Sequence, residues 1–142
     1  MIQIYTDGAW RKKDNASAAS AVIVWENGKI DVFHRYLGNT TNNCAELHAI
    51  TLGLNNLLKI RGTEYPVKVY SDSTYAVGIL SKDWKPKANI HLITKIKAII
   101  SQFRDIELKW VKGHSKNKYN RLADLLANIC IDQHLNIDKK YL

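Results

Sequence analysis

Three strand-like patterns follow one another at the start of the chain, and no other feature restricts the fold as much. Residues 2–7 (IQIYTD) and 29–37 (KIDVFHRYL) alternate between apolar and polar side chains, whereas residues 18–26 (AASAVIVWE) are apolar and rich in β-branched side chains. Alternation is typical of half-buried strands, and Asn27-Gly28 is a favoured pair for a tight turn between the last two patterns. The sequence therefore predicts an antiparallel meander at the N-terminus.

Helix and strand patterns alternate in the rest of the chain. Apolar residues at helical spacing predict helices, and short runs of β-forming residues predict strands. The predicted order is a helix at 44–60, a strand at 66–72, helices at 74–80 and 90–103, a strand at 107–112 and a helix at 119–134. This order predicts an α/β fold in which helices cover a mixed sheet.

The length and charge of the chain restrict its organisation and its partners. At 142 residues the chain has the size of one domain, and we expect residues 1–142 to form a single domain. Lys and Arg number 21 against 13 Asp and Glu, and the resulting net charge of +8 favours a polyanion such as nucleic acid. The sequence lacks a membrane-spanning run, a basic amphipathic helix and a signal peptide, so we expect a cytoplasmic protein with no membrane partner.

Four acidic residues are predicted to meet at one edge of the sheet. Asp7 and Asp72 each follow a run of β-forming residues, at the point where the strand should end. Neighbouring strands lie about 4.8 Å apart, so parallel pairing would bring these two carboxylates together. Glu46 and Asp124 lie early in predicted helices and can point toward the same carboxyl ends of the strands, where open α/β sheets bind ligands.

Each acid also has an ordinary interpretation when it is taken alone. Asp7 precedes Gly8 as a turn residue would, Asp72 resembles a helix cap, and the other two acids could be solvated helix charges. Four acids gathered at one place would repel strongly unless cations lay between them. Oxygen ligands favour Mg²⁺ or Mn²⁺, and two such ions about 4 Å apart are suited to phosphodiester cleavage.

Ordered motifs along nearly the whole chain resemble those of one family. They are YTDGA at 5–9, TNNCAEL at 41–47, YSDS at 70–73, WVKGH at 110–114 and NRLADLLA at 120–127. In this order and spacing they resemble the type 1 ribonucleases H, enzymes that cut the RNA strand of RNA/DNA hybrids. The resemblance implies a ribonuclease H-like α/β fold: a five-stranded mixed sheet, with three strands antiparallel and two parallel, flanked by helices.

The resemblance also implies the catalytic residues and the cofactor. Asp7 would bridge two Mg²⁺ ions, with Mn²⁺ as the alternative, while Glu46 and Asp72 would complete the ion beside the leaving group. Asp124 would hold the ion that activates water, and His114 would move protons or help to release product. The family reaction is endonucleolytic and leaves 5′-phosphate and 3′-hydroxyl ends.

A second group of residues is expected to contact the hybrid. The resemblance gives most of this group, and Lys116 and Lys118 join it because they surround His114 with positive charge. For Trp84, a partly buried aromatic side chain is an equally good interpretation. The expected substrate-binding residues are Thr41, Asn42, Asn43, Ser73, Trp84, Asn89, Lys116 and Lys118.

The chain departs from the family pattern in three places. AWRKKDNASAAS follows the first motif where many members have a Gly/Pro-rich stretch, so the asparagine expected to touch RNA is either Asn15 or missing. Asn39 occupies the position of a phosphate-pocket arginine in some relatives. The segment 82–89 (KDWKPKAN) is too short for the helix and basic handle of many bacterial members. We expect a monomer, in which a protein partner could replace the handle.

Two other functions remain open on the sequence alone. A DNA-strand transferase or integrase would share the fold and a carboxylate-metal core, but Asp124 and the TNN stretch beside Glu46 argue against it. A hybrid-binding module without chemistry is the second alternative, and the presence of all four acids argues against that.

Overall fold

The computed structural model contains a five-stranded mixed sheet with the strand order β3-β2-β1-β4-β5. The structure describes residues 1–113 and 116–141, and of residues 137–141 it describes the backbone alone. The strands are β1 (Ile2–Arg11), β2 (Ala16–Val24), β3 (Ile30–Tyr36), β4 (Val67–Ser71) and β5 (Ile106–Trp110). β1, β2 and β3 pair antiparallel, whereas β4 pairs parallel with both β1 and β5. The predicted arrangement of three antiparallel and two parallel strands is confirmed.

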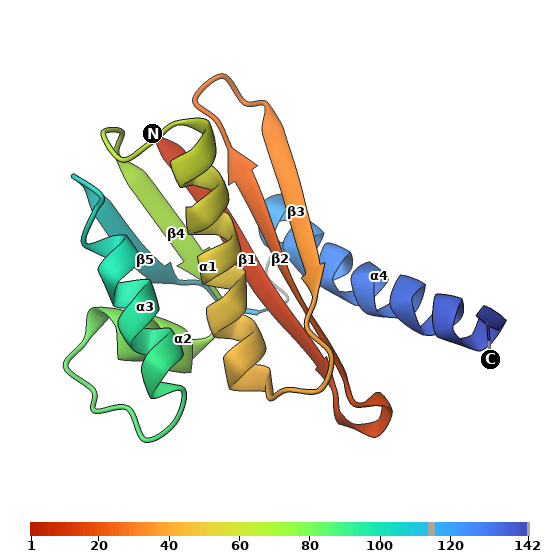
Figure 1. Ribbon diagram of the computed structural model, residues 1–142. Helices are drawn as coiled ribbons and strands as arrows, with labels where there is room; N and C mark the ends of the chain where they lie inside the picture. Colours follow the sequence, from red (N-terminus) through yellow and green to blue (C-terminus); the bar gives the residue numbers. More distant parts are fainter. Residues whose placement is uncertain (114–115, 142) are drawn as a thin grey trace.

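Helices cover both faces of this sheet (Figure 1). The helices are α1 (Asn42–Ile60), α2 (Thr74–Ser81), α3 (Ile90–Ile100) and α4 (Lys118–Tyr141), and a short 3-10 turn, η1 (Lys12–Asp14), joins β1 to β2. α1 crosses one face, with α2 and α3 beside it, while α4 crosses the other face and extends past β3. Within the described residues, none of these helices is both long and apolar enough to cross a membrane.

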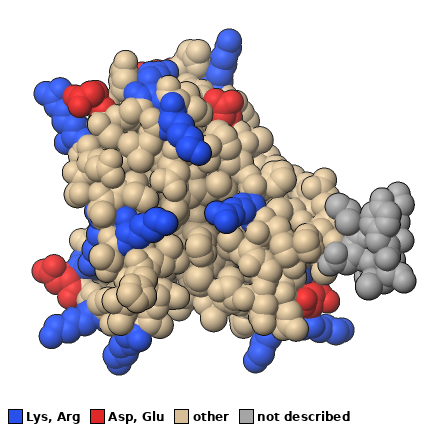
Figure 2. Space-filling view, in the orientation of Figure 1, with Lys and Arg blue, Asp and Glu red and all other residues tan. Residues whose placement is uncertain are grey.

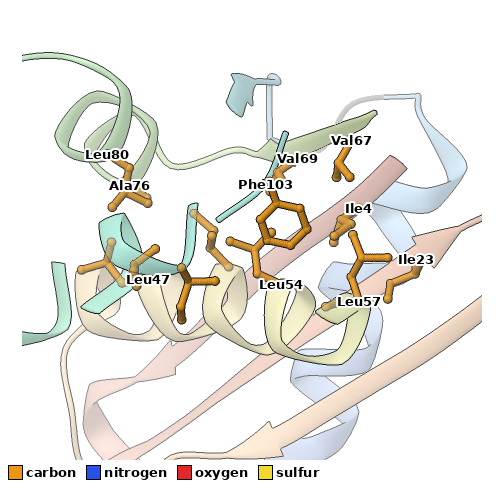
Figure 3. Close-up of a cluster of buried hydrophobic side chains, with 14 of the residues drawn as sticks. Ile4, Ile23, Leu47, Leu54, Leu57, Val67, Val69, Ala76, Leu80 and Phe103 are labelled. Atoms are coloured by element: carbon orange, nitrogen blue, oxygen red, sulfur yellow. The ribbon is translucent and has the colours of Figure 1, made fainter. Parts of the chain in front are cut away.

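The main hydrophobic core lies between α1 and the sheet (Figure 3). Ile4 from β1 and Ile23 from β2 point toward α1, where Leu54 and Leu57 meet them, and Phe103 closes the cluster after α3. Alternate residues of the same strands point the other way and pack against α4, as Val22 does against Ala123. The period-2 alternation of the strands thus supplies apolar side chains to both helical layers.

The turn between β2 and β3 forms where the sequence predicted it. Gly28 donates its backbone N–H to the carbonyl of Trp25 over 2.9 Å, and its φ of 84° lies in the left-handed region that glycine adopts without strain. Figure 1 shows this hairpin at the end of the sheet away from the first turn of α1.

β1 is longer than predicted, which changes the position of Asp7. The strand does not end at Asp7, because antiparallel pairing with β2 continues from Asp7 opposite Ser20 to Arg11 opposite Ala16. The parallel pairing with β4 stops one residue earlier, at Thr6 opposite Ser71. Asp7 therefore lies inside β1, at the point where its parallel neighbour has ended and left that edge open.

α1 begins two residues before the predicted start. Thr41 caps the helix, because its hydroxyl oxygen accepts the backbone N–H of Cys44 over 3.2 Å. Asn42 and Asn43 consequently lie in the first turn of α1, and Glu46 lies one turn into it.

Candidate active site

Three carboxylates from three different elements converge at the open edge beside β1. Asp7 on β1, Glu46 on α1 and Asp72 just after β4 each offer an oxygen, and these oxygens lie within 4.8 Å of one another. Asp7 and Glu46 are buried, each with 5% of its surface exposed, and Asp72 is half-buried. This separation allows one small cation to contact more than one of these acids.

Gly8 allows β1 and α1 to approach closely enough for this convergence. A Cβ atom on Gly8 would lie 2.6 Å from the carbonyl carbon of Ala45 and from the backbone nitrogen of Glu46, which is closer than nonbonded atoms tolerate. The Gly8 N–H donates a hydrogen bond to Oε1 of Glu46. Glycine is therefore required at the residue after Asp7, because the backbone itself is the contact surface.

Asp72 is held by contacts to its backbone and to the residues that follow it. The indole N–H of Trp110, at the end of β5, donates to the Asp72 carbonyl over 3.0 Å. Ser73 caps α2 by accepting the N–H of Ala76 over 3.0 Å, so Asp72 is not the cap that the ordinary interpretation proposed. Gly113 passes close by, since a Cβ there would lie 3.2 Å from Oδ2 of Asp72.

Asp124 reaches the same site from the opposite face of the sheet. Its carboxylate is near enough to that of Asp7 to contribute to the raised pKa of Asp7. The hydroxyl of Ser20 on β2 donates to the carbonyl of Ala123, which ties α4 to the sheet next to Asp124. All four acids line one cavity of about 750 Å³. The structure thus brings together the four residues that the sequence singled out as metal ligands.

The crowded carboxylates perturb one another. Burial, followed by the charges of Glu46, Asp72 and Asp124, raises the pKa of Asp7 to about 10. Burial, followed by the charge of Asp72, raises the pKa of Glu46 to about 8, although the Gly8 N–H opposes this change. Without cations, Asp7 and Glu46 therefore favour their protonated forms at neutral pH, and an all-oxygen set of this kind fits a hard divalent cation.

The asparagines of the TNN stretch border the acids. Asn42 and Asn43 are exposed and line the same cavity as the four carboxylates. Thr41 and Asn43 also line a neighbouring cavity of about 500 Å³, together with Trp84 and Asn89. The residues predicted to bind substrate from α1 and from segment 82–89 therefore share one surface beside the acids.

Trp84 fits both interpretations made from the sequence, a substrate contact and a partly buried aromatic side chain. Its ring lies against Gly78 of α2, where an added Cβ would come within 2.1 Å of a ring carbon. The residue is nevertheless 47% exposed and lines the second cavity. Its contact with substrate stays a prediction.

The remaining predicted residues are His114, Lys116, Lys118 and Asn15. His114 falls outside the described residues. Lys116 and Lys118 are exposed, and the Nζ of Lys118 lies 5.0 Å from the centre of the Tyr119 ring. Asn15, the candidate RNA-contacting asparagine, is exposed at the end of η1 with a φ of 47°.

Sequence reasoning missed several residues at these cavities, three of which could contact metal ligands or phosphates. Asn128 lines the acid cavity, and Lys85 and Lys87 line the second cavity. The spacing of Asn128, four residues after Asp124, is a signal that could have indicated a shared helix face. The two lysines belong to segment 82–89, which is described throughout and contains no helix, as its shortness predicted.

Comparison with known proteins shows the family to which the chain belongs. The sequence model of the RNase H family matches residues 1–131. The chain belongs to the RNase H family. A ribonuclease H of Wolbachia sp. subsp. Drosophila simulans (strain wRi) is 33% identical to it, and the alignment covers 92% of this chain and 94% of that relative. A ribonuclease H of Ehrlichia ruminantium (strain Gardel) is 34% identical, and the alignment covers 89% of this chain and 91% of that relative.

Solved structures of RNase H proteins agree. The N-terminal RNase H domain of a Mycobacterium tuberculosis protein superimposes with a TM-score of 0.83 at 29% identity and covers 96% of this chain and 97% of that domain. LC11-RNase H1, solved in complex with an RNA/DNA hybrid, superimposes with a TM-score of 0.81 at 28% identity. The superposition covers 95% of this chain and 99% of LC11-RNase H1. The predicted RNase H fold and enzyme class are confirmed.

Proposed function

We propose that this RNase H protein is an endonuclease that hydrolyses the RNA strand of RNA/DNA hybrids and leaves 5′-phosphate and 3′-hydroxyl ends. The observation that carries the proposal is the convergence of Asp7, Glu46 and Asp72 within 4.8 Å at an open sheet edge, with Asp124 beside them. The similarity to LC11-RNase H1, whose structure contains a hybrid, supports the choice of substrate. We assign the activity to one domain, residues 1–142, acting as a monomer.

The acids are suited to hold two divalent cations, and Mg²⁺ fits their all-oxygen donor set, with Mn²⁺ as the alternative. The charges of Glu46, Asp72 and Asp124 all act on Asp7, so it is the residue that we assign to serve both ions. When bound, the two ions would supply the charge that activates a water and stabilises the leaving oxygen of a phosphodiester.

The side chains around the acids then bind, orient and handle protons. Asp7 and Glu46 must lose the protons that their raised pKa values favour before they can bind cations. Asn42 and Asn43 present amide groups to the cavity, where they can contact the hybrid's minor groove, and 2′-hydroxyls there distinguish RNA from DNA. We assign proton transfer or product release to His114.

The charge of the molecule suits the binding of a polyanion. On the face covered by α1 and α3, Lys and Arg side chains lie both at the margins and nearer the middle, whereas Asp and Glu lie toward the margins (Figure 2). Lys85 and Lys87 beside Trp84 are positioned to replace part of the handle that segment 82–89 is too short to form. A protein partner could supply the rest of the affinity for substrate.

The test is a cleavage assay on four labelled substrates: an RNA/DNA hybrid, double-stranded RNA, single-stranded RNA and duplex DNA. Each is incubated with the protein in Mg²⁺, in Mn²⁺ and in chelator. We expect metal-dependent cutting of the RNA strand in the hybrid alone, with a phosphate on the 5′ end of the downstream product. Cutting of duplex DNA would favour the strand-transferase alternative, and tight hybrid binding without cutting would indicate a binding module.

A further inference from the structure

Arg11, at the end of β1, is connected to Asp124 through the side chain of Asn128. The guanidinium of Arg11 donates from Nη2 to the side-chain oxygen of Asn128 over 3.2 Å and to the Asn128 carbonyl over 3.3 Å. The Nδ2 of Asn128 in turn donates to Oδ1 of Asp124 over 3.3 Å and to the Asp124 carbonyl over 3.0 Å. A continuous chain of hydrogen bonds therefore runs from Arg11 to a carboxylate of the site.

The orientation of the Asn128 amide follows from the chemistry of its two partners. A guanidinium only donates hydrogen bonds, so the amide oxygen must face Arg11. The amide NH₂ then faces Asp124, whose carboxylate oxygen accepts from it. With Arg11 in place, turning the amide over would set two donors against each other and leave two acceptors facing each other.

Arg11 is itself fixed by α4. Its Nη1 forms an ion pair with Asp132 at 2.6 Å, and the Arg11 side chain is 30% exposed. Asp124, Asn128 and Asp132 are spaced by four residues and so lie along one stripe of α4. Arg11 joins this stripe to β1, the strand that carries Asp7.

We infer that Arg11 and Asn128 are positioning residues that hold the Asp124 carboxylate in place for a divalent cation. The inference rests on the proposed function, in which Asp124 is a metal ligand. Groups that orient a ligating carboxylate commonly change metal affinity by about 10- to 100-fold when removed. Arg11 therefore binds α4 and is not free to contact substrate phosphates, although it belongs to a basic stretch, Arg11-Lys12-Lys13, that follows Asp7 in the sequence.

The first experiment measures metal binding without substrate. Mn²⁺ is titrated calorimetrically into the full chain as wild type, Asn128→Ala and Asn128→Leu, the last of which keeps most of the volume but cannot donate. Asn56→Ala is the matched control, because Asn56 in α1 also donates to the carbonyl four residues earlier, at Leu52 over 2.8 Å, but lines neither the acid cavity nor the one beside it. We expect both Asn128 variants to weaken Mn²⁺ binding about 10-fold and the control to match wild type.

A double-mutant cycle then tests whether Arg11 acts through Asn128. We expect Arg11→Ala to weaken Mn²⁺ binding less than Asn128→Ala, and the double variant to bind no more weakly than Asn128→Ala alone, because the two residues form one chain. Thermal melting of each variant separates loss of folding from loss of metal affinity.

Folded Asn128→Ala and Asn128→Leu proteins with wild-type Mn²⁺ affinity would overturn the inference, as would additive effects of the Arg11 and Asn128 substitutions. Since Mn²⁺ binding is measured without substrate, these outcomes are independent of whether the wild type cuts hybrids. The positioning role and the proposed function can therefore fail separately.

Discussion

The backbone N–H of Gly8 on β1 donates a hydrogen bond to the carboxylate of Glu46 on α1. Gly8 directly follows Asp7, so this contact fixes the distance between two of the acids through the backbone. The strand and the helix can approach this closely because Gly8 has no side chain between them. The spacing of the acids is thus built into the main-chain packing.

Gly8→Ala should separate Glu46 from Asp7 and weaken metal binding as well as folding. The new Cβ would lie 2.6 Å from two backbone atoms of α1, which cannot rotate away. Gly53→Ala is a suitable control, because its Cβ would lie 2.7 Å from the Ile4 side chain in the core, away from the acids. We expect both variants to melt at lower temperature, but only Gly8→Ala to need at least about 10-fold more Mg²⁺ for half-maximal cleavage. Equal Mg²⁺ requirements would contradict this view of Gly8.

Asp7→Asn should abolish hybrid cleavage and leave the fold intact. Asp7 is the acid placed to serve both cations, and a neutral amide cannot offset their charge. Asparagine also removes the free-energy cost of keeping Asp7 protonated in the folded state at neutral pH, so the melting temperature in chelator should equal or exceed that of wild type. Gel-based cleavage and thermal melting measure the two effects. Substantial Mg²⁺-dependent cutting by the purified variant would rule out the two-ion assignment.

The metal-free protein should lose stability as the pH rises. The pKa of Asp7 is raised to about 10 and that of Glu46 to about 8, so the folded state keeps protons that the unfolded chain releases near pH 4. The unfolded state then binds fewer protons, and the free energy of unfolding falls between about pH 4 and pH 8, and further toward pH 10.

Thermal melts in chelator from pH 5 to 9 check this expectation. The Asp7→Asn protein should show a shallower decline than wild type, because one of the two groups no longer titrates. Saturating Mn²⁺ should reverse the trend over the same range, since cation binding requires the deprotonated acids. A wild-type melting temperature in chelator that rises toward pH 9 would contradict the raised pKa values.

Local signals were sufficient to predict most of the fold. The alternation in β1 and β3 and the Asn27-Gly28 turn depend on neighbouring residues alone, and they appeared where expected. The convergence of Asp7 and Asp72 also followed from one topological assumption, the parallel pairing of β1 with β4. Features encoded within a few residues of sequence could therefore be predicted.

Features that depend on distant partners could not be predicted. β1 continues past Asp7 because β2 offers pairing as far as Ala16, and nothing in the sequence of β1 itself signals this. Asn128 is oriented by Arg11, which lies 117 residues away along the chain. Long-range contacts of this kind are fixed by packing and leave only weak traces in local sequence.

His114→Ala should slow catalysis without weakening metal binding. We expect kcat to fall by about 10²-fold, the usual scale for a residue that transfers a proton, with a smaller change in KM. Calorimetric Mn²⁺ affinity should stay at the wild-type value, which separates a role in proton transfer or product release from a role as a ligand. Wild-type turnover by this variant would show that His114 has no role in proton transfer or product release.

Because this chain lacks the basic handle of many bacterial members, we expect it to bind substrate phosphates with two pairs of lysines near the acids. Lys116 lies just before α4 and Lys118 is its first residue, and both are exposed, while Lys85 and Lys87 line the cavity beside Trp84. If each lysine neutralises one phosphate, replacing either pair with Ala should flatten the slope of log affinity against log salt by about two. KM at moderate salt should rise while kcat stays nearly constant.

The measurement is hybrid binding and cleavage from low to physiological salt by the wild type and both double variants. Lys29→Ala is the control, because this lysine is exposed in the hairpin at the other end of the sheet, where its removal lowers the net charge without touching either cavity (Figure 1). A flattened slope for the Lys85/Lys87 double variant alone would show that segment 82–89 binds the phosphates. Lys116 and Lys118 would then not contribute to substrate affinity. Wild-type slopes for both pairs would mean that neither side holds phosphates. Arg11 is held by Asp132 and Asn128, so the search would then move to Lys12 and Lys13, which are exposed, or to a partner protein.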